Sequence, residues 1–293
     1  MTAGDLETAP AGPRRWAIGL PRPTTAAVLG LVLVAAHLLL AGLGGWLAPQ
    51  LPGAIVSSQS FATPGQVPPL GTDYLGRDLL SRLLHGARYT LGLASVTTAV
   101  GFVLGLLVGF AAAEAGGWTD VAISRALDVL ISFPPLLLAL VVIATLGPSI
   151  VVLIGTVAFI HAKRVARIAR SIAMGIAAQD FVEVARARGE GSWWIIRREI
   201  WPNTLGPLAA EFGLRMTFSI LFLSALSFLG LGIQPPLADW GLMVRENLSG
   251  LYYGVLPVLL PAMAIASLTV GINLVVDWLG SATDRDIAGE LFR

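Results

Sequence analysis

The sequence predicts an all-α membrane protein with six transmembrane helices and both termini in the cytoplasm. Of its 293 residues, 55% are hydrophobic and only 13% are charged, and the mean hydropathy is +0.77. Soluble domains carry about 25% charged residues. The apolar residues also gather in blocks, several of which reach the roughly 20 residues that a helix needs to cross a bilayer. The third observation is that fifteen of the nineteen lysines and arginines fall on segments that this arrangement places inside the cell.

The first helix is expected within residues 26–48, after a polar, proline-rich tail at residues 1–25. Its apolar block, Ala26–Trp46, contains His37 as its single ionisable group. The apolar core of a cleaved signal peptide is about 7–15 residues long. A block of this length therefore predicts a retained span. For His37, at mid-depth in it, an interhelical hydrogen bond is favoured over a proton relay.

Five further spans are expected to form a membrane core over residues 89–280, with a cytoplasmic loop at 173–211 and a cytoplasmic tail at 281–293. They are predicted at Leu91–Ala113, Val129–Gly147, Ile150–Ala166, Leu214–Gly232 and Val255–Leu279. The fourth of the six spans ends in a basic run, which predicts a helix that projects past the lipid headgroups. Its cations are Lys163, Arg164, Arg167 and Arg170.

The third span is interrupted by Phe133-Pro134-Pro135. Proline removes a backbone donor and kinks or breaks a helix. The break is either purely structural or part of a transport pathway, because broken helices also line the pathways of transporters.

Three polar side chains border the cytoplasmic ends of spans. Arg125 and Asp128 lie three residues apart at the start of the third span, so an ion pair between them is favoured over a gating contact. Asn273 lies near the inner end of the last span, where a structural role is favoured over a role in the pathway.

Residues 49–88 are expected outside the cell and are rich in proline, glycine and serine. Within them, Asp78–Leu84 alternates apolar and charged residues at helical spacing, which predicts a short helix at the membrane interface. Four charged side chains of this segment either contact a docked partner protein or pair with one another: Asp73, Arg77, Asp78 and Arg82.

The cytoplasmic loop predicts two short helices joined by a turn. Asp180 is expected to cap the first helix and Glu183 to complete a capping box. Gly189 stands where a helix ends at positive φ. Ser192 is expected to cap the second helix and Pro202 to stop it. The loop's exposed apolar side chains either lie on the membrane or on the protein itself, or they dock into a partner; they are Phe181, Val184, Trp193, Trp194, Ile196 and Trp201.

Composition excludes several kinds of site. A formal net charge of +1 gives no reason to expect nucleic acid. Cysteine is absent, which excludes disulfides and thiolate metal sites. Lys163 is the only lysine and does not follow Gly-x-x-x-x-Gly, so the chain carries no P-loop. We therefore expect no cofactor, no metal and no catalytic residue in this chain.

The loop resembles a known family. Glu183-Val184-Ala185, followed by Gly189, Ile200 and Pro202, is similar to the EAA loop of permease subunits in binding-protein-dependent ABC importers. Three more segments are similar to dipeptide/oligopeptide permeases of the "C" type: Gly71–Arg88, Gly116–Leu138 and Leu226–Gly241. Val184 departs from the usual alanine, and residues 277–286 differ from the usual ending.

The resemblance implies the type I ABC importer permease architecture in the cell inner membrane. It implies half of a translocation pathway for peptides or a similar small solute, shared with a second homologous permease subunit. An extracytoplasmic binding protein delivers the solute, and two ATPase subunits bind the ATP and magnesium. The loop residues expected to couple to the ATPases are Asp180, Phe181, Glu183, Ala185, Gly189, Trp193, Ile200 and Pro202. Phe133, Pro134 and Asn273 are candidates for the pathway or its gate, and Asp73, Arg77 and Asp78 for contact with the binding protein.

Two other function classes compete with the importer. An ion-coupled secondary transporter usually shows charges inside the membrane or inverted repeats of broken helices. An intramembrane enzyme needs a nucleophile and a base, or metal ligands, within the bilayer. The sequence offers only His37 at that depth, so the importer is favoured over both.

Overall fold

A computed structural model describes residues 23–65, 68–254 and 256–291 of the chain. Most of the tail expected at residues 1–25 lies outside these ranges. The described residues form helices and connecting loops, and their extended pairing consists of two isolated bridges, Ile55 with Arg77 and Thr72 with Asp78. The all-α prediction is confirmed for this part of the chain.

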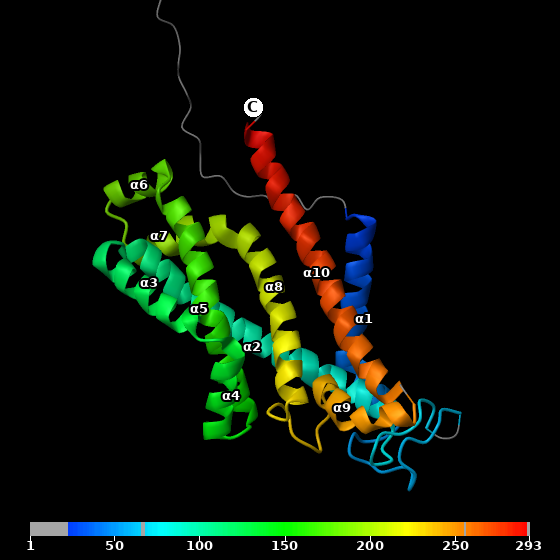
Figure 1. Cartoon of the computed structure of the whole chain (residues 1–293). Helices are drawn as coiled ribbons and strands as arrows, with labels where there is room; N and C mark the ends of the chain where they lie inside the picture. The colour runs from blue at the N-terminus through cyan, green and yellow to red at the C-terminus, as the bar shows by residue number, and fades with distance from the viewer. Residues whose placement is uncertain (1–22, 66–67, 255, 292–293) are drawn as a thin grey trace, which may run out of the picture.

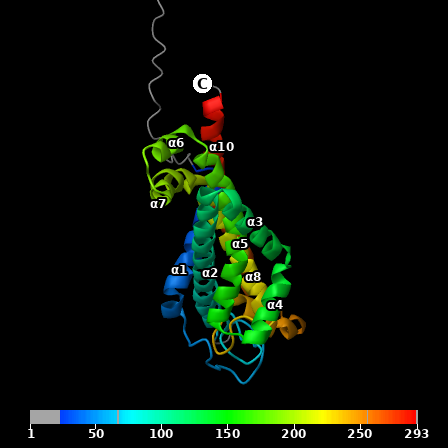
Figure 2. The ribbon, with the colours of Figure 1, turned by 90° about the vertical axis from the view of Figure 1, so that its left-hand side faces the viewer.

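The helices make one elongated bundle (Figures 1 and 2). In chain order they are α1 (Thr25–Leu47), α2 (Leu79–Ala115), α3 (Gly117–Ser132), α4 (Pro135–Leu146), α5 (Ile150–Ala177), α6 (Asp180–Ala187), α7 (Ser192–Ile195), the π-helical turn η1 (Ile196–Ile200), α8 (Trp201–Phe228), α9 (Trp240–Glu246), the 3₁₀ turn η2 (Leu248–Tyr252) and α10 (Leu256–Leu291). Both views place α6 and α7 at one end of the bundle, together with the start of α1 and the end of α10. The loop before α2, with α9, lies at the opposite end.

The number of membrane-length helices differs from the six predicted. In the described part of the chain, four helices are long and apolar enough to cross a bilayer: α1, α2, the continuous helix Ser192–Phe228 and the Leu256–Ser281 part of α10. The bent pair α3–α4 makes a fifth. Helix α5 is long enough to cross a bilayer, but it is not counted among these helices because the basic run makes its second half too charged. Helix α10 continues to Leu291, so it includes most of the segment that was expected as a cytoplasmic tail.

Helix α2 begins well before the predicted second span. Asp78 caps it by accepting hydrogen bonds from the backbone N–H groups of Leu80 and Ser81. The helix then runs without a break for 37 residues. The short interfacial helix predicted at Asp78–Leu84 is therefore the first part of α2. Gly86 does not end it; a Cβ there would lie 2.9 Å from the Trp240 ring, so this glycine lets α9 pack closely.

The third predicted span is broken rather than kinked. Helix α3 ends at Ser132, α4 begins at Pro135, and their axes differ by 82°. Two consecutive prolines lack the N–H groups that would continue the helical ladder. Phe133 and Pro134 form the joint, both in extended conformation (ψ 126° and 123°).

The core is formed mainly by α2, α5, α8 and α10, and α2 approaches α5 through a stripe of glycines. A Cβ on Gly101 would lie 2.6 Å from the Ala158 carbonyl oxygen, and one on Gly109 would lie 2.5 Å from that of Ala166. Gly105 lies between them on the same face. Small residues of this kind let helix backbones approach closely in membrane proteins, and they fix the distance between α2 and α5.

Candidate functional site

The predicted loop is a helical hairpin with a buried inner face. Val182 and Ala185 of α6 are completely buried, and Val182 packs with Ile195 into an apolar cluster over the ends of α2 and α5. The opposite face is open: Val184 is 56% exposed, and Phe181 is 36% exposed. Predicted coupling residue Ala185 therefore anchors the hairpin, whereas Phe181 is available to a partner.

The turn between α6 and α7 has the predicted left-handed glycine, with φ +83° at Gly189. Polar contacts hold the turn on both sides. Arg186 of α6 donates to Glu114 at the end of α2 (3.0 Å), and the Arg188 guanidinium lies 5.8 Å from the centre of the Trp194 ring. Trp193, in the neighbouring turn of α7, is 67% exposed. The hairpin thus presents exposed aromatic residues from a fixed frame.

The predicted caps of the hairpin are wrong by one residue. Gln179 precedes α6, and its carbonyl accepts the N–H groups of Val182 and Glu183 without a side-chain cap. Asp180 is consequently the first helical residue, and Glu183 makes no capping-box bond. Gly191, not Ser192, precedes α7. Both carboxylates still lie in the first turn of α6, where the helix dipole favours negative charge.

Pro202 does not stop the second helix. The turn η1 has π-helical pitch, and the Trp201 N–H bonds to the Ile196 carbonyl, five residues back. Pro202 follows directly on this π turn, in the first turn of α8, and π turns are places where the helical ladder adjusts locally. The loop helix and the following span are therefore one continuous helix, with Ile200 buried at the π turn.

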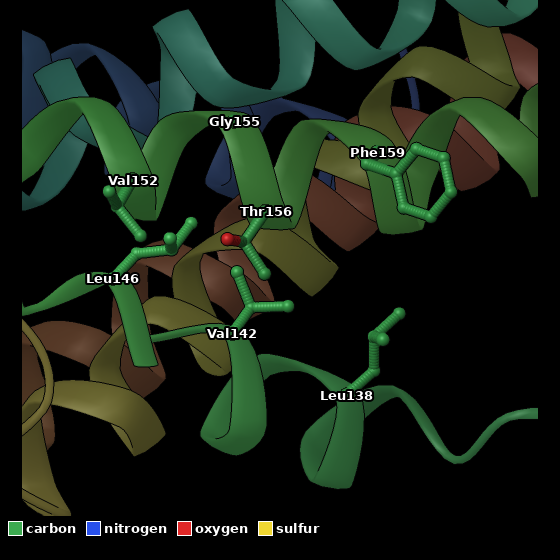
Figure 3. Close-up of a pocket in the computed structure, with 7 residues that line it drawn as sticks. All are labelled: Leu138, Val142, Leu146, Val152, Gly155, Thr156 and Phe159. Carbon is green, nitrogen blue, oxygen red and sulfur yellow. The ribbon is translucent and has the colours of Figure 1, made fainter. Parts of the chain in front are cut away.

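The candidate pathway residues lie in two separate places. Phe133 is 52% exposed at the α3–α4 joint, beside Pro134. Asn273 of α10 instead accepts a hydrogen bond from Thr217 of α8 (3.2 Å) and braces those two helices. A cavity of about 300 Å³ lies between α4 and α5 (Figure 3). Leu138, Val142, Leu146, Val152, Gly155, Thr156 and Phe159 line it, so Thr156 supplies its one polar side chain.

At the opposite end of the bundle, the charged residues before α2 are buried and paired. Asp73 accepts hydrogen bonds from Arg77 (2.6 Å) and Arg82, and both guanidinium groups also reach Glu246 of α9, at 3.0 and 2.8 Å. Asp73 and Arg82 are completely buried, and Arg77 is 4% exposed. With Asp78 serving as the α2 cap, this arrangement matches the second of the two readings of the sequence, in which these groups pair with one another.

Burial raises the pKa of two further groups near α9. Burial raises the pKa of Asp239 to about 6, and hydrogen bonds from Ser227 and from the N–H groups of Gly241 and Leu242 act in the opposite direction. Burial and the neighbouring Glu246 carboxylate also raise the pKa of the Tyr74 hydroxyl. Asp239 caps α9, and Tyr74 joins the loop before α2 to α9 through its hydroxyl bond to Glu246.

Replacing Asp73 with asparagine is expected to destabilise this end of the molecule. Two buried guanidinium groups would then share Glu246 alone, and breaking a buried pair costs about 3–5 kcal/mol. The thermal midpoint of the purified protein and its abundance in membranes measure the effect. Asp128→Asn is the control, because its pair with Arg167 is half exposed and such pairs contribute about 0–1 kcal/mol. Equal midpoints for the two variants would contradict the expectation.

Sequence reasoning missed a buried polar chain across three helices. Thr98 of α2 bonds to Ser219 of α8 (2.6 Å), and Ser219 bonds to His161 of α5 (2.8 Å). His37 was therefore not the only ionisable group available within the helices, although its predicted interhelical bond is confirmed, with Ser267 of α10 at 3.2 Å. The sequence signal that could have indicated this chain is the presence of hydroxyl residues, Thr98 and Ser219, within otherwise apolar helices.

The family model of the binding-protein-dependent transport system inner membrane component matches residues 101–289. The chain belongs to this family. Membership confirms the predicted family and an inner-membrane location, and it identifies the chain as a non-catalytic permease component of an ABC transport system.

Relatives of this family are similar over most of the chain. The glutathione transport system permease protein GsiD of Pectobacterium atrosepticum is 35% identical over 73% of this chain and 71% of the relative. The dipeptide transport system permease protein DppC of Alkalihalophilus pseudofirmus is 31% identical over 88% and 85%. The di/tripeptide transport system permease protein DppC of Pseudomonas aeruginosa is 36% identical over 82% and 81%.

A solved structure shares the permease fold. It is the crystal structure of an amino acid ABC transporter with histidines, which matches with a TM-score of 0.51 over 68% of this chain and 93% of that chain, at 18% identity. The ABC permease fold is thus shown for the helical bundle.

Proposed function

We propose that this permease forms half of the translocation pathway of an ATP-driven importer for dipeptides or oligopeptides. A second permease subunit completes the pathway, and an extracytoplasmic binding protein delivers the solute. The names of the relatives support this class of solute, since they are permeases for dipeptides, di/tripeptides and glutathione. Glutathione is itself a tripeptide.

The observation that carries the proposal is the two-faced hairpin of α6 and α7. Its inner face is locked into the bundle by Val182 and Ile195, while Phe181, Val184 and Trp193 are exposed on the outside. Such a surface suits docking of a short helix into a groove of a partner. We assign that groove to an ATPase subunit. The importer has two such subunits, which bind ATP and magnesium. Asp180 and Glu183 add exposed negative charge to the docking surface.

The proposed orientation has six crossings, with α3–α4 as one broken span and α5 as the sixth. Two observations support it. The start of α1, the hairpin and the end of α10 lie at the same end of the bundle (Figure 1), and the segments at that end carry most of the lysine and arginine. Exposed aromatics mark both ends: Trp46 and Tyr252 at one, Trp118 at the other. Tryptophan and tyrosine are enriched at membrane interfaces.

Asp73, Arg77 and Asp78 retain an indirect role in this proposal. Their side chains are buried, so they act on binding-protein docking by shaping the outer loop.

Uptake by reconstituted vesicles tests the function. Vesicles with both permeases and both ATPases should accumulate a labelled dipeptide only with ATP and the binding protein, and omission of this chain should abolish accumulation. Uptake driven by an ion gradient without ATP would support the secondary transporter instead.

Cysteine labelling tests the orientation. The chain has no cysteine of its own. Ser60, in the loop before α2, and Ser192, the first residue of α7, are both exposed, and Figure 1 shows that loop and α7 at opposite ends of the bundle. An impermeant thiol reagent should label Ser60→Cys in intact cells and leave Ser192→Cys unlabelled until the cells are opened. The reverse pattern would overturn the orientation.

A further inference from the structure

A row of cations on α5 faces α3. Arg170 makes two hydrogen bonds to Asp120, Arg167 pairs with Asp128, and Lys163 donates to the backbone carbonyl of Leu130 at 2.5 Å. The three cations recur at positions i, i+4 and i+7, which lie on one side of a helix. Their acceptors run backwards along α3, as antiparallel neighbours must. We call these three contacts the α3–α5 seam.

The two halves of the broken span are held by different forces. Ala139 and Ile143 of α4 are completely buried in the main apolar core. In α3, Leu127 is the buried residue among those the structure describes. Helix α3 therefore depends on the polar seam, whereas α4 is fixed by apolar packing. Figure 2 shows the two halves diverging beside α5.

Lys163 lies at the end of the seam nearest to the joint. In a continuous helix the Leu130 carbonyl would accept the N–H of residue 134, but residue 134 is proline and has none. The Lys163 ammonium donates a hydrogen bond to that carbonyl instead. Lys163 itself is only 2% exposed. Leu130 is partly buried, and a carbonyl left without a donor there is costly, so this contact stabilises the break.

We propose that the α3–α5 seam, in which Lys163 is the positioning residue beside the α3–α4 joint, opens when α3 swings away from α5 during transport. This inference rests on the proposed function. It concerns which part of the permease moves, and it assigns that motion to the polar half of the broken span while α4 stays in the core.

The reactivity of Lys163 tests the opening. Because the chain has no other lysine, acetylation of this residue by a membrane-permeant amine reagent can be followed by peptide mass spectrometry in the complete complex. We expect slow acetylation without nucleotide and acetylation several-fold faster in the vanadate-trapped complex. Equal rates in the two states of a complex that transports would overturn the seam proposal. Absence of transport by the wild-type complex would instead count against the proposed function.

Moving the lysine by one residue provides the control. Arg164 is exposed beside the buried Lys163, so the double variant Lys163→Arg, Arg164→Lys presents a lysine outside the seam. It should react quickly with and without nucleotide. If the acetylation rate of the moved lysine depends on nucleotide as strongly as that of Lys163 in the wild type, the change in rate does not come from opening of the seam. That result would overturn the inference.

A reversible cross-link between α3 and α5 tests whether transport requires the seam to open. Asp120→Cys with Arg170→Cys places two thiols across the seam, to be joined by a short bifunctional methanethiosulfonate, which forms a reducible disulfide with each thiol. Cross-linking should abolish ATP-driven uptake, and reduction should restore the level that the same variant had before. Asp120→Cys alone, treated with the same reagent, should keep its uptake. Undiminished uptake in the fully cross-linked complex would overturn the proposal.

Discussion

Gly189→Val is expected to abolish solute uptake while leaving the amount of permease in the membrane near normal. Gly189 has φ +83°, and no atom lies within 4 Å of the position a Cβ would take. The effect is therefore one of backbone conformation, which costs about 1–2 kcal/mol for a residue with a Cβ in the left-handed region. To avoid it, the turn must change, and the exposed aromatics of α6 and α7 lose their relative placement. Membrane insertion should survive, because the turn lies outside the spans.

Co-purification of the ATPase subunits and substrate-stimulated ATP hydrolysis, measured together, would locate the defect. Gly191→Val is the matched control, since Gly191 has φ −76° and an equally open surrounding. It should retain uptake. Glu183→Ala should be milder than Gly189→Val, because Glu183 makes no capping bond and would lose only its contact with the partner. Wild-type uptake in Gly189→Val would show that the hairpin is a surface feature without a coupling role.

Gly105→Leu is expected to prevent accumulation of folded permease. A Cβ at this position would lie 2.5 Å from the Val165 Cβ and 2.8 Å from the Ala162 carbonyl oxygen. Backbone atoms of α5 cannot rotate away, so α2 and α5 would have to separate along the glycine stripe. Overpacking a close-packed site costs about 1–3 kcal/mol or more. Gly101 and Gly109 would lose their close contacts as well.

Membrane abundance and resistance to protease report this effect. Gly92→Leu serves as the control, because Gly92 lies on the same helix, is exposed, and has no atom within 4 Å of a Cβ. It should accumulate like the wild type. Similar abundance for both variants would contradict the close approach of α2 and α5.

Local sequence signals predicted the family, the all-helical fold and the conformation of Gly189, because each is recorded in a short stretch of sequence: a motif, an apolar block or a helix end. The ends of helices were less predictable. The helix predicted at Asp78–Leu84 and the span predicted at Leu91–Ala113 are one helix, and Pro202 was expected to stop a helix but follows a π turn. In both cases a contact or a backbone adjustment outside the local pattern decides the outcome.

Ion pairs show the same limit. Arg125 was expected to pair with Asp128, but Asp128 pairs with Arg167, 39 residues away. Pairs three residues apart on a helix contribute only about 0.2–0.5 kcal/mol, so a partner from another helix easily displaces them. The part of Glu246 in the network of Asp73 was beyond prediction for a related reason, because Glu246 lies 169 residues after Arg77 in the sequence.

The π turn before α8 has a mechanical consequence. Ser192–Phe228 is one continuous helix that changes direction between α7 and α8 (Figure 1), so a movement of the hairpin passes to α8 through unbroken helical backbone. One residue corresponds to about 100° of rotation about a helix axis. The pitch of Ile196–Ile200 thus sets the rotation of the α8 side chains relative to the hairpin, and deleting one residue there would turn the α8 faces by about a quarter of a circle.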